Sequence, residues 1–138
     1  MFYKKNRGVT LVEMLIVIII IGILAALAFP QFSKTKEHAI GKEAIVNLKL
    51  IAAAEKIYRM EGDVYYPIPA GEVSGSTAIS NINDFLRLSI PKGDTKNWDY
   101  AVSSLTNTST ATRFSGSSSG CTYTINFTAD EPTNVSCP

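Results

Sequence analysis

The chain has 138 residues and a formal net charge of +1, a length that allows one small folded domain and an N-terminal extension. Lys4, Lys5 and Arg7 place three positive charges in the first eight residues. From Val9 onward the chain has ten Lys/Arg and twelve Asp/Glu, a formal charge of −2. That balance leaves no basic face for direct nucleic-acid binding. His38 is the only histidine and there are two cysteines. One histidine and two cysteines are too few for a typical zinc site or for a nucleophile–base pair. The sequence therefore predicts no catalytic, metal or cofactor site.

An apolar segment follows the basic leader at residues 9–29, and its only charged side chain is Glu13. A helix over this segment is long enough to cross a bilayer core. The basic residues before it predict a cytoplasmic N-terminus. An ordinary secretory signal peptide is the alternative, since residues 26–28 (Ala-Leu-Ala) have the small-residue pattern of a cleavage site. The length of the run, its glutamate and the helical pattern beyond Phe29 favour a retained membrane helix.

The residues at the start of this segment carry a recognisable motif. Gly8-Val9-Thr10-Leu11-Val12-Glu13 resembles the class III signal of type IV pilins and pseudopilins, usually written G-F-T-L-x-E. Residues 22–26 and 29–32 are also similar to the family pattern. The close resemblance covers residues 4–32, and a looser one continues to about residue 66. Position 9 is Val where most members have Phe, which keeps an apolar residue but puts the efficiency of cleavage in doubt.

The resemblance implies a processing pathway and an assembly role. A prepilin peptidase would cut between Gly8 and Val9 on the cytoplasmic side and N-methylate the new Val9 amine with its own S-adenosylmethionine. The protein would wait in the inner membrane as a single-pass chain, and the pilus assembly machinery would then build it into a homo-oligomeric helical filament. That filament would be an extracellular pilus or a periplasmic pseudopilus. The resemblance assigns assembly roles to Glu13 and Thr10.

The charge on Glu13 supports this interpretation on physical grounds. A carboxylate in hydrocarbon costs at least ~2.5 kcal/mol and normally has a partner. In a processed chain the nearest cation is the Val9 α-amine, one helical turn away. The pair can form within a subunit or between neighbours, and the second arrangement would fix the axial register during assembly. The alternative is a lone glutamate that reaches the membrane interface by snorkelling.

The helix is expected to continue beyond the membrane to residue 60. Pro30 lacks an N–H and Gly22 is a weak helix former, so both positions predict a kink. The family resemblance implies unwinding between them when subunits pack, and simple bends are the alternative. Residues 31–60 form an amphipathic continuation. One side carries lysines spaced by seven (Lys42, Lys49, Lys56), and the other carries apolar residues (Ile40, Ala44, Leu48, Ile51, Ala54, Tyr58).

Residues 61–138 predict a small globular head, which makes the fold α+β. Residues 61–63 (Glu-Gly-Asp) are expected to end the long helix. A short helix is expected at 81–88, with Phe85, Leu86 and Leu88 available for burial. Strands are expected at 98–102, 111–115 and 121–128, from their alternation of apolar and polar residues. These elements predict an antiparallel sheet of three or slightly more strands lying on the helix, as in the pilin fold.

Cys121 and Cys137 lie in the predicted head, where an oxidising compartment would join them in a disulfide. Free thiols or a metal-binding pair are the alternatives. The resemblance here is to the C-terminal disulfide loop of type IV pilins. Between Ser103 and Gly120, eleven of eighteen residues are Ser or Thr. This stretch predicts either a solvated hairpin or a glycosylated surface.

The sequence therefore predicts a pilin precursor, a structural subunit that polymerises into type IV pili for adhesion, motility or DNA uptake, and not an enzyme. A pseudopilin of a type II secretion system is the alternative, and its calcium site would draw on Asp130 and Glu131 with Asp94 or Asp99. A minor, filament-initiating pilin is also possible. A membrane-anchored periplasmic enzyme or binding module is a further alternative from another class. It would need convergent polar groups in a pocket.

Overall fold

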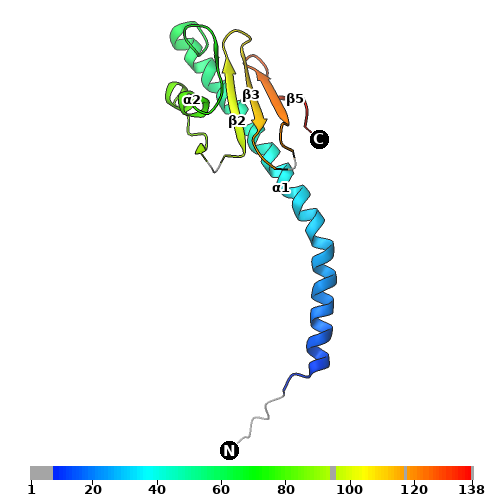
Figure 1. Cartoon of the computed structure of the whole chain (residues 1–138). Coiled ribbons are helices and arrows are strands. Elements are labelled where there is room, and N and C mark those ends of the chain that lie inside the picture. The colour runs from blue at the N-terminus through cyan, green and yellow to red at the C-terminus, as the bar shows by residue number, and fades with distance from the viewer. Residues whose placement is uncertain (1–7, 94–95, 117, 138) are drawn as a thin grey trace, which may run out of the picture. The chain divides into compact units, whose positions relative to one another are not determined.

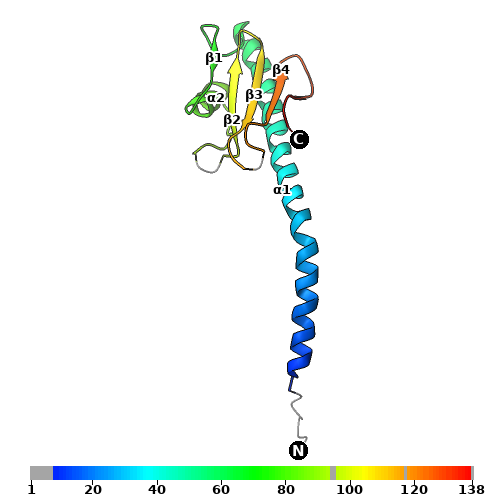
Figure 2. The ribbon, with the colours of Figure 1, turned by 45° about the vertical axis from the view of Figure 1, so that its right-hand side comes forward.

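A computed structural model describes residues 8–93, 96–116 and 118–137, with the side chains of residues 28–30 excepted. The elements in chain order are helix α1 (Leu11–Gly62), strand β1 (Glu72–Val73), helix α2 (Ala78–Leu86), and strands β2 (Trp98–Ser103), β3 (Thr108–Arg113), β4 (Thr122–Asn126) and β5 (Thr133–Asn134) (Figures 1 and 2). Contacts divide the chain into two units, Met1–His38 and Ala39–Pro138. The α+β fold class is confirmed.

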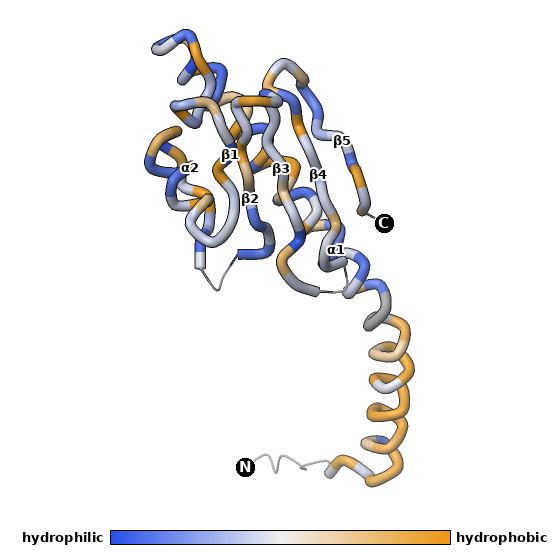
Figure 3. Tube along the Cα trace, turned by 45° about the horizontal axis from the view of Figure 1, so that its top comes forward, coloured by the Kyte–Doolittle hydropathy of each residue, from blue (hydrophilic) through white to orange (hydrophobic). Residues whose placement is uncertain are grey.

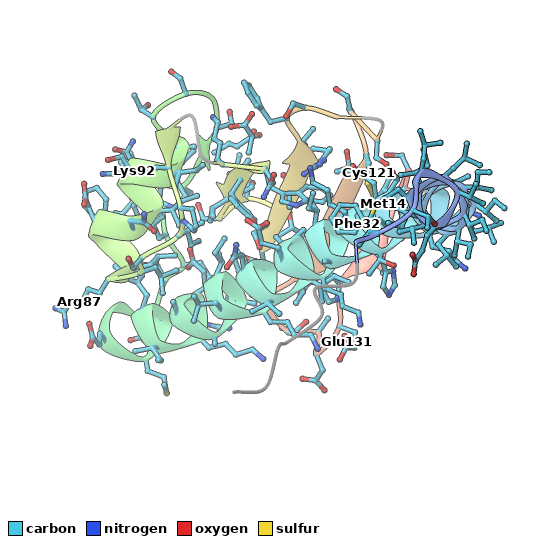
Figure 4. All side chains as sticks on the ribbon, turned by 90° about the horizontal axis from the view of Figure 1, so that it is seen from below. Met14, Phe32, Arg87, Lys92, Cys121 and Glu131 are labelled. Atoms are coloured by element: carbon cyan, nitrogen blue, oxygen red, sulfur yellow. A yellow bond between two sulfur atoms is a disulfide. The ribbon has the colours of Figure 1, made fainter. Side chains whose placement is uncertain are left out.

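The first unit contains the apolar part of α1. Figure 3 shows this stretch as an almost unbroken apolar coil, and Figure 4 views it nearly end-on, with side chains radiating in every direction. Every residue from Val9 to Leu27 is exposed. The backbone is helical through both Gly22 and Pro30, and the kink assigned to them stays a prediction. Of the described helices, only α1 is long and apolar enough to cross a membrane.

The long helix ends where the sequence predicts. Asp63 has a left-handed backbone with φ of 58°, and its N–H donates to the Arg59 carbonyl at 2.7 Å. That bond satisfies one of the carbonyls left unpaired at a helix C-terminus. The helix starts two residues later and ends two residues later than the expected 9–60, a difference within the usual uncertainty of helix boundaries.

The second unit packs a five-stranded antiparallel sheet, in the order β1-β2-β3-β4-β5, against the C-terminal part of α1. In Figure 2 strands β2, β3 and β4 lie side by side in front of α1. The three long strands are the predicted ones, although β3 spans 108–113 rather than 111–115. Its true start was hidden because Ser and Thr, not apolar residues, occupy its first three positions. The edge strands β1 and β5 have two residues each and no hydrophobic signal of their own.

The core of this unit lies between α1, α2 and the inner face of the sheet. It includes Ala44, Leu48, Ile51 and Ala52 from α1, Ala78, Ile79, Ile82 and Leu86 from α2, Trp98, Tyr100, Val102, Ala111 and Ile125 from the sheet, and Tyr66, Ile90, Cys121 and Phe127 from the connecting segments. Two hydrogen bonds join helix and strand: Trp98 Nε1 donates to the Ile40 carbonyl at 2.8 Å, and Asn47 Nδ2 donates to Tyr100 Oη at 2.8 Å. Both polar side chains are thereby satisfied where they meet the core.

The short helix α2 begins three residues before the predicted start at 81 and ends at Leu86. Of the residues expected to bury there, Leu86 is in the core, but Phe85 is 57% exposed and stacks on Tyr66 at 4.8 Å between ring centroids. Burial of Phe85 was therefore a wrong prediction. The earlier start makes Ile79 and Ile82 the inward positions, and Phe85 lies at the margin of that face.

Candidate functional site

The N-terminal motif lies at the first turn of α1. Gly8, Val9 and Thr10 precede the helix and are exposed, so the predicted cleavage bond is in an accessible, non-helical segment. Residues 1–7, which hold the basic leader, lie outside the described part of the chain. The Gly8–Val9 bond suits a peptidase because proteases need an extended, accessible backbone.

Thr10 has a structural role that sequence reasoning left open. It is the last residue before α1, and its Oγ1 accepts a hydrogen bond from the Glu13 N–H at 3.2 Å. Thr at the N-cap with Glu three residues later is the sequence pattern of a capping box. The Thr-x-x-Glu part of the motif therefore fixes the start of the helix directly after the predicted cleavage point.

Glu13 has no charged partner among the described residues of its own chain. It is the acidic residue of the first turn of α1, where the helix dipole favours negative charge. Its side chain is exposed, and none of the ion pairs among the described residues involves it. Cleavage before Val9 would create an α-amine within a turn of this carboxylate. The geometry leaves Glu13 available to that amine in the same subunit or in a neighbour.

A second apolar surface runs along α1 within the other unit. Val46, Leu50, Ala53, Ile57 and Met60 recur at intervals of four and three residues and are all exposed. We call these five residues the outer stripe. They lie on the opposite side of the helix from the core residues Ala44, Leu48 and Ile51. Spacings of this kind are typical of helices that pack against other helices.

The C-terminal loop is closed by the disulfide that the two cysteines led us to expect. Cys121 and Cys137 are bonded, with Cα atoms 4.6 Å apart, and the described residues hold no free cysteine. Within the loop, Lys49 of α1 pairs with Glu131; Figure 4 shows the labelled Glu131 beside α1. The loop is thus held at its end by a covalent bond and near its middle by an ion pair with the helix.

The described residues of the alternative calcium site, Asp99, Asp130 and Glu131, form no group that could hold a metal ion. Glu131 pairs with Lys49, Asp99 pairs with Lys96, and Asp94 lies outside the described residues. The described part of the chain contains no group of three or more His, Cys, Asp or Glu side chains placed to hold a metal ion.

Sequence reasoning missed Glu55, a carboxylate in the core. It is fully buried; Oε2 accepts a hydrogen bond from the Tyr66 N–H at 2.9 Å, and Oε1 has no partner among the described residues. Burial raises the pKa of this carboxyl to about 7. A signal was present, because Leu48, Ile51, Glu55 and Tyr58 follow the helical spacing of the core face.

Comparison with known proteins places the motif in a family. Residues 3–29 match the prokaryotic N-terminal methylation motif. The chain is 47% identical over 64 residues to the type IV major pilin protein PilA of Myxococcus xanthus, covering 46% of this chain and 29% of the relative. It is 37% identical over 62 residues to the type II secretion system core protein G of Pseudomonas aeruginosa, covering 45% and 44%. For core protein G of Escherichia coli the identity is 36% over 61 residues, covering 44% and 42%.

These similarities involve less than half of the chain and less than half of each relative. No solved structure matches the chain. Stretches of about 60 residues are nevertheless similar both to a pilin and to secretion-system core proteins. The N-terminal part of the chain is therefore similar to type IV pilins and to type II secretion pseudopilins.

Proposed function

We propose that this protein is a structural subunit that polymerises, through α1, into a type IV pilus. The observation that carries the proposal is that the residues matching the methylation motif include a wholly exposed apolar segment of α1 with one acidic side chain, Glu13. Exposed apolar area of this extent is a membrane or protein interface. A lipid environment suits the subunit before assembly, and neighbouring helices suit it afterwards.

The two apolar surfaces of α1 support a subunit that is packed by its own kind. Between Met14 and Leu27, α1 is apolar on every side, as expected of a helix surrounded by lipid or by other helices. In the second unit the outer stripe faces away from the sheet, so that part of α1 has a covered face and an uncovered one. Packing copies side by side would bury both surfaces and would bring a neighbour's Val9 amine within reach of Glu13.

The proposal is tested by neutralising Glu13 in the cell. We expect Glu13→Gln to be inserted and processed normally, with at least a tenfold lower yield of sheared surface filaments, because a subunit entering the filament loses its charge partner. Mass spectrometry of the membrane fraction measures cleavage and methylation at Val9. Glu61→Gln is the control, since Glu61 is an exposed glutamate at the other end of the same helix. Wild-type filament yield from Glu13→Gln would refute this role of Glu13.

A pseudopilin of a type II secretion system is the second candidate, and the matches to core protein G from several bacteria favour it. In that case the filament would be short and periplasmic. Deleting the gene and scoring surface motility and protein secretion separately distinguishes the two. Loss of motility with intact secretion supports the pilus, whereas the reverse result supports the pseudopilus.

A further inference from the structure

A pocket lies where α1 ends and the connection to β1 begins. It has a volume of about 300 Å³, and its lining includes two charged residues, Arg59 and Asp63, and four apolar ones, Val64, Pro67, Ile68 and Ala70. We call it the helix-end pocket. All of its residues belong to the second unit, so the pocket lies within one subunit and within one unit of it. Its volume reaches the lower end of the ~300–1,000 Å³ range of sites that hold a small ligand.

Hydrogen bonds hold the wall that the connection forms. Ser104 Oγ, directly after β2, donates to the Pro67 carbonyl at 3.1 Å and accepts from the Gly71 N–H at 3.0 Å. The Tyr66 N–H donates to Oε2 of the buried Glu55 at 2.9 Å. The connection is thereby tied to the sheet on one side and to α1 on the other. A site whose walls are already held loses less conformational entropy when a ligand binds.

The guanidinium of Arg59 is positioned by Tyr65. Arg59 Nη1 donates to Tyr65 Oη at 3.0 Å, and the guanidinium carbon lies 4.9 Å from the centre of the Tyr65 ring. That ring packs in turn against Phe127, with 4.9 Å between the ring centroids. A guanidinium has five N–H donors, and the hydrogen bonds among the described residues use one of them. Arg59 therefore keeps donors for a carboxylate, which it can bind through two parallel hydrogen bonds.

Asp63 lies four residues after Arg59 but does not pair with it. Opposite charges at this spacing on a helix usually attract each other across one turn. Asp63, however, has the left-handed backbone that ends α1, so its side chain does not follow the helical spacing. Neither residue belongs to an ion pair among the described residues, and both are exposed. The pocket therefore presents a cation and an anion that do not neutralise each other by direct contact.

The two charges and the apolar wall decide which class of ligand fits. A polyanion would be repelled by Asp63 and would find a single cation, and a simple carboxylate or amine would leave one of the two charges unpaired. The side chains of Val64 and Ile68 are exposed and gain from being covered by an apolar group. The side-chain amide of Asn107, which also lines the pocket, has no partner among the described residues and can add a hydrogen bond.

An α-amino acid carries a carboxylate and an ammonium group on one carbon and matches this arrangement. We propose that the helix-end pocket binds a free α-amino acid with an apolar side chain. Its carboxylate is held by Arg59 and its ammonium group by Asp63, and its side chain covers Val64 and Ile68.

The binding belongs to a single subunit and does not depend on the proposed polymerisation, so it is measured on the full chain in detergent. The probe is L-leucine, titrated into isotope-labelled protein while the amide NMR signals are followed. Isocaproate has the apolar chain and the carboxylate of leucine but no ammonium group. Isoamylamine has the apolar chain and the ammonium group but no carboxylate. The two compounds therefore separate the contributions of the two charges.

We expect leucine to cause saturable shifts of amide signals within residues 63–70 and 104–107. Isocaproate and isoamylamine should each bind about tenfold more weakly or less, because each leaves one charge of the pocket unpaired. Arg59→Gln and Asp63→Asn should weaken leucine binding to a similar extent, and asparagine tolerates the left-handed backbone at position 63. Lys56→Gln and Glu61→Gln are the matched controls, since both residues are exposed charges of α1 outside the pocket lining. The fluorescence of the buried Trp98 checks that each variant is folded.

Three results would overturn the proposal. The first is the absence of saturable shifts with leucine at the residues of the pocket. The second is equal binding of isocaproate and leucine, since the pocket would then be a simple anion site. The third is unchanged leucine binding by both Arg59→Gln and Asp63→Asn, since the two charges would then not hold the ligand. None of these results bears on filament assembly, which is scored separately by the yield of sheared filaments.

Discussion

The buried carboxylate of Glu55 predicts that the head loses stability as the pH rises. The group lies well beyond the apolar segment of α1, inside the core of the second unit. Its pKa in the folded chain is about 7, against an ordinary value of 4.5, because burial disfavours the charged form. The folded state therefore holds a proton that the unfolded state releases between these two values. The contribution of this proton to the free energy of unfolding is fully present below pH 4.5. It falls between pH 4.5 and pH 7 and is lost above pH 7.

The size of the effect follows from the two pKa values. At 1.36 kcal/mol for each pH unit between them, the folded state loses about 3 kcal/mol on going from pH 4.5 to pH 8. For a unit of this size, that free energy corresponds to roughly 10–20 °C in melting temperature. Tyr66, whose N–H donates to this carboxyl, does not titrate in this range, because burial raises its pKa above the ordinary value of 10.

Glu55→Gln isolates the contribution of this group. The amide oxygen can still accept the Tyr66 N–H, and the side chain is neutral at every pH. The full chain in detergent is unfolded by heat from pH 4.5 to pH 8, with the fluorescence of Trp98 as the readout, since Trp98 is the only tryptophan and is buried. We expect the melting temperature of the variant to fall much less over this range than that of the wild type. Glu61→Gln, at an exposed site, should follow the wild type.

The same pH dependence in the wild type and in Glu55→Gln would refute the reasoning, because the slope would then come from other carboxylates. Glu55→Leu adds a second check at pH 8. It removes the charge but leaves the Tyr66 N–H without its acceptor, at a cost of about 1–3 kcal/mol. The leucine variant should therefore be less stable than the glutamine variant.

Two further predictions concern the ends of the chain. Replacing Cys121 and Cys137 together by Ser should destabilise the head by about 3 kcal/mol, the value expected for a loop of this length, and reduction of the wild type should give the same loss in a thermal scan. Thr10→Val should cost about 1 kcal/mol at the start of α1, since the Glu13 N–H loses its acceptor. Faster hydrogen exchange at Glu13, with unchanged exchange near Leu48, would show this, and equal exchange at Glu13 would contradict it.

The sequence was most informative where one signal dominates. The apolar segment, the alternation in β2 and β4 and the cysteine pair each depend on strong local patterns, and the structure has the same features. The sequence was least informative for elements that form only because they pair with a neighbouring strand. Strand β1 forms by pairing with β2, and β5 forms by pairing with β4, over two residues in each case. Glu72–Val73 and Thr133–Asn134 are too short for a sequence pattern to predict a strand there.

Two acidic residues of α1 show how differently one helix can accommodate a charge in apolar surroundings. Glu55 is surrounded by its own chain, which supplies a backbone donor and enough burial to favour the protonated form. Glu13 is exposed on an apolar helix and, among the described residues, has no cation of its own chain as a partner. Neutralising Glu55 should therefore change the stability of the head, whereas neutralising Glu13 should leave the stability of the head unchanged and lower the assembly of subunits. If Glu13→Gln gives a stable, processed chain that does not assemble, the charge of Glu13 acts between subunits and not within one subunit.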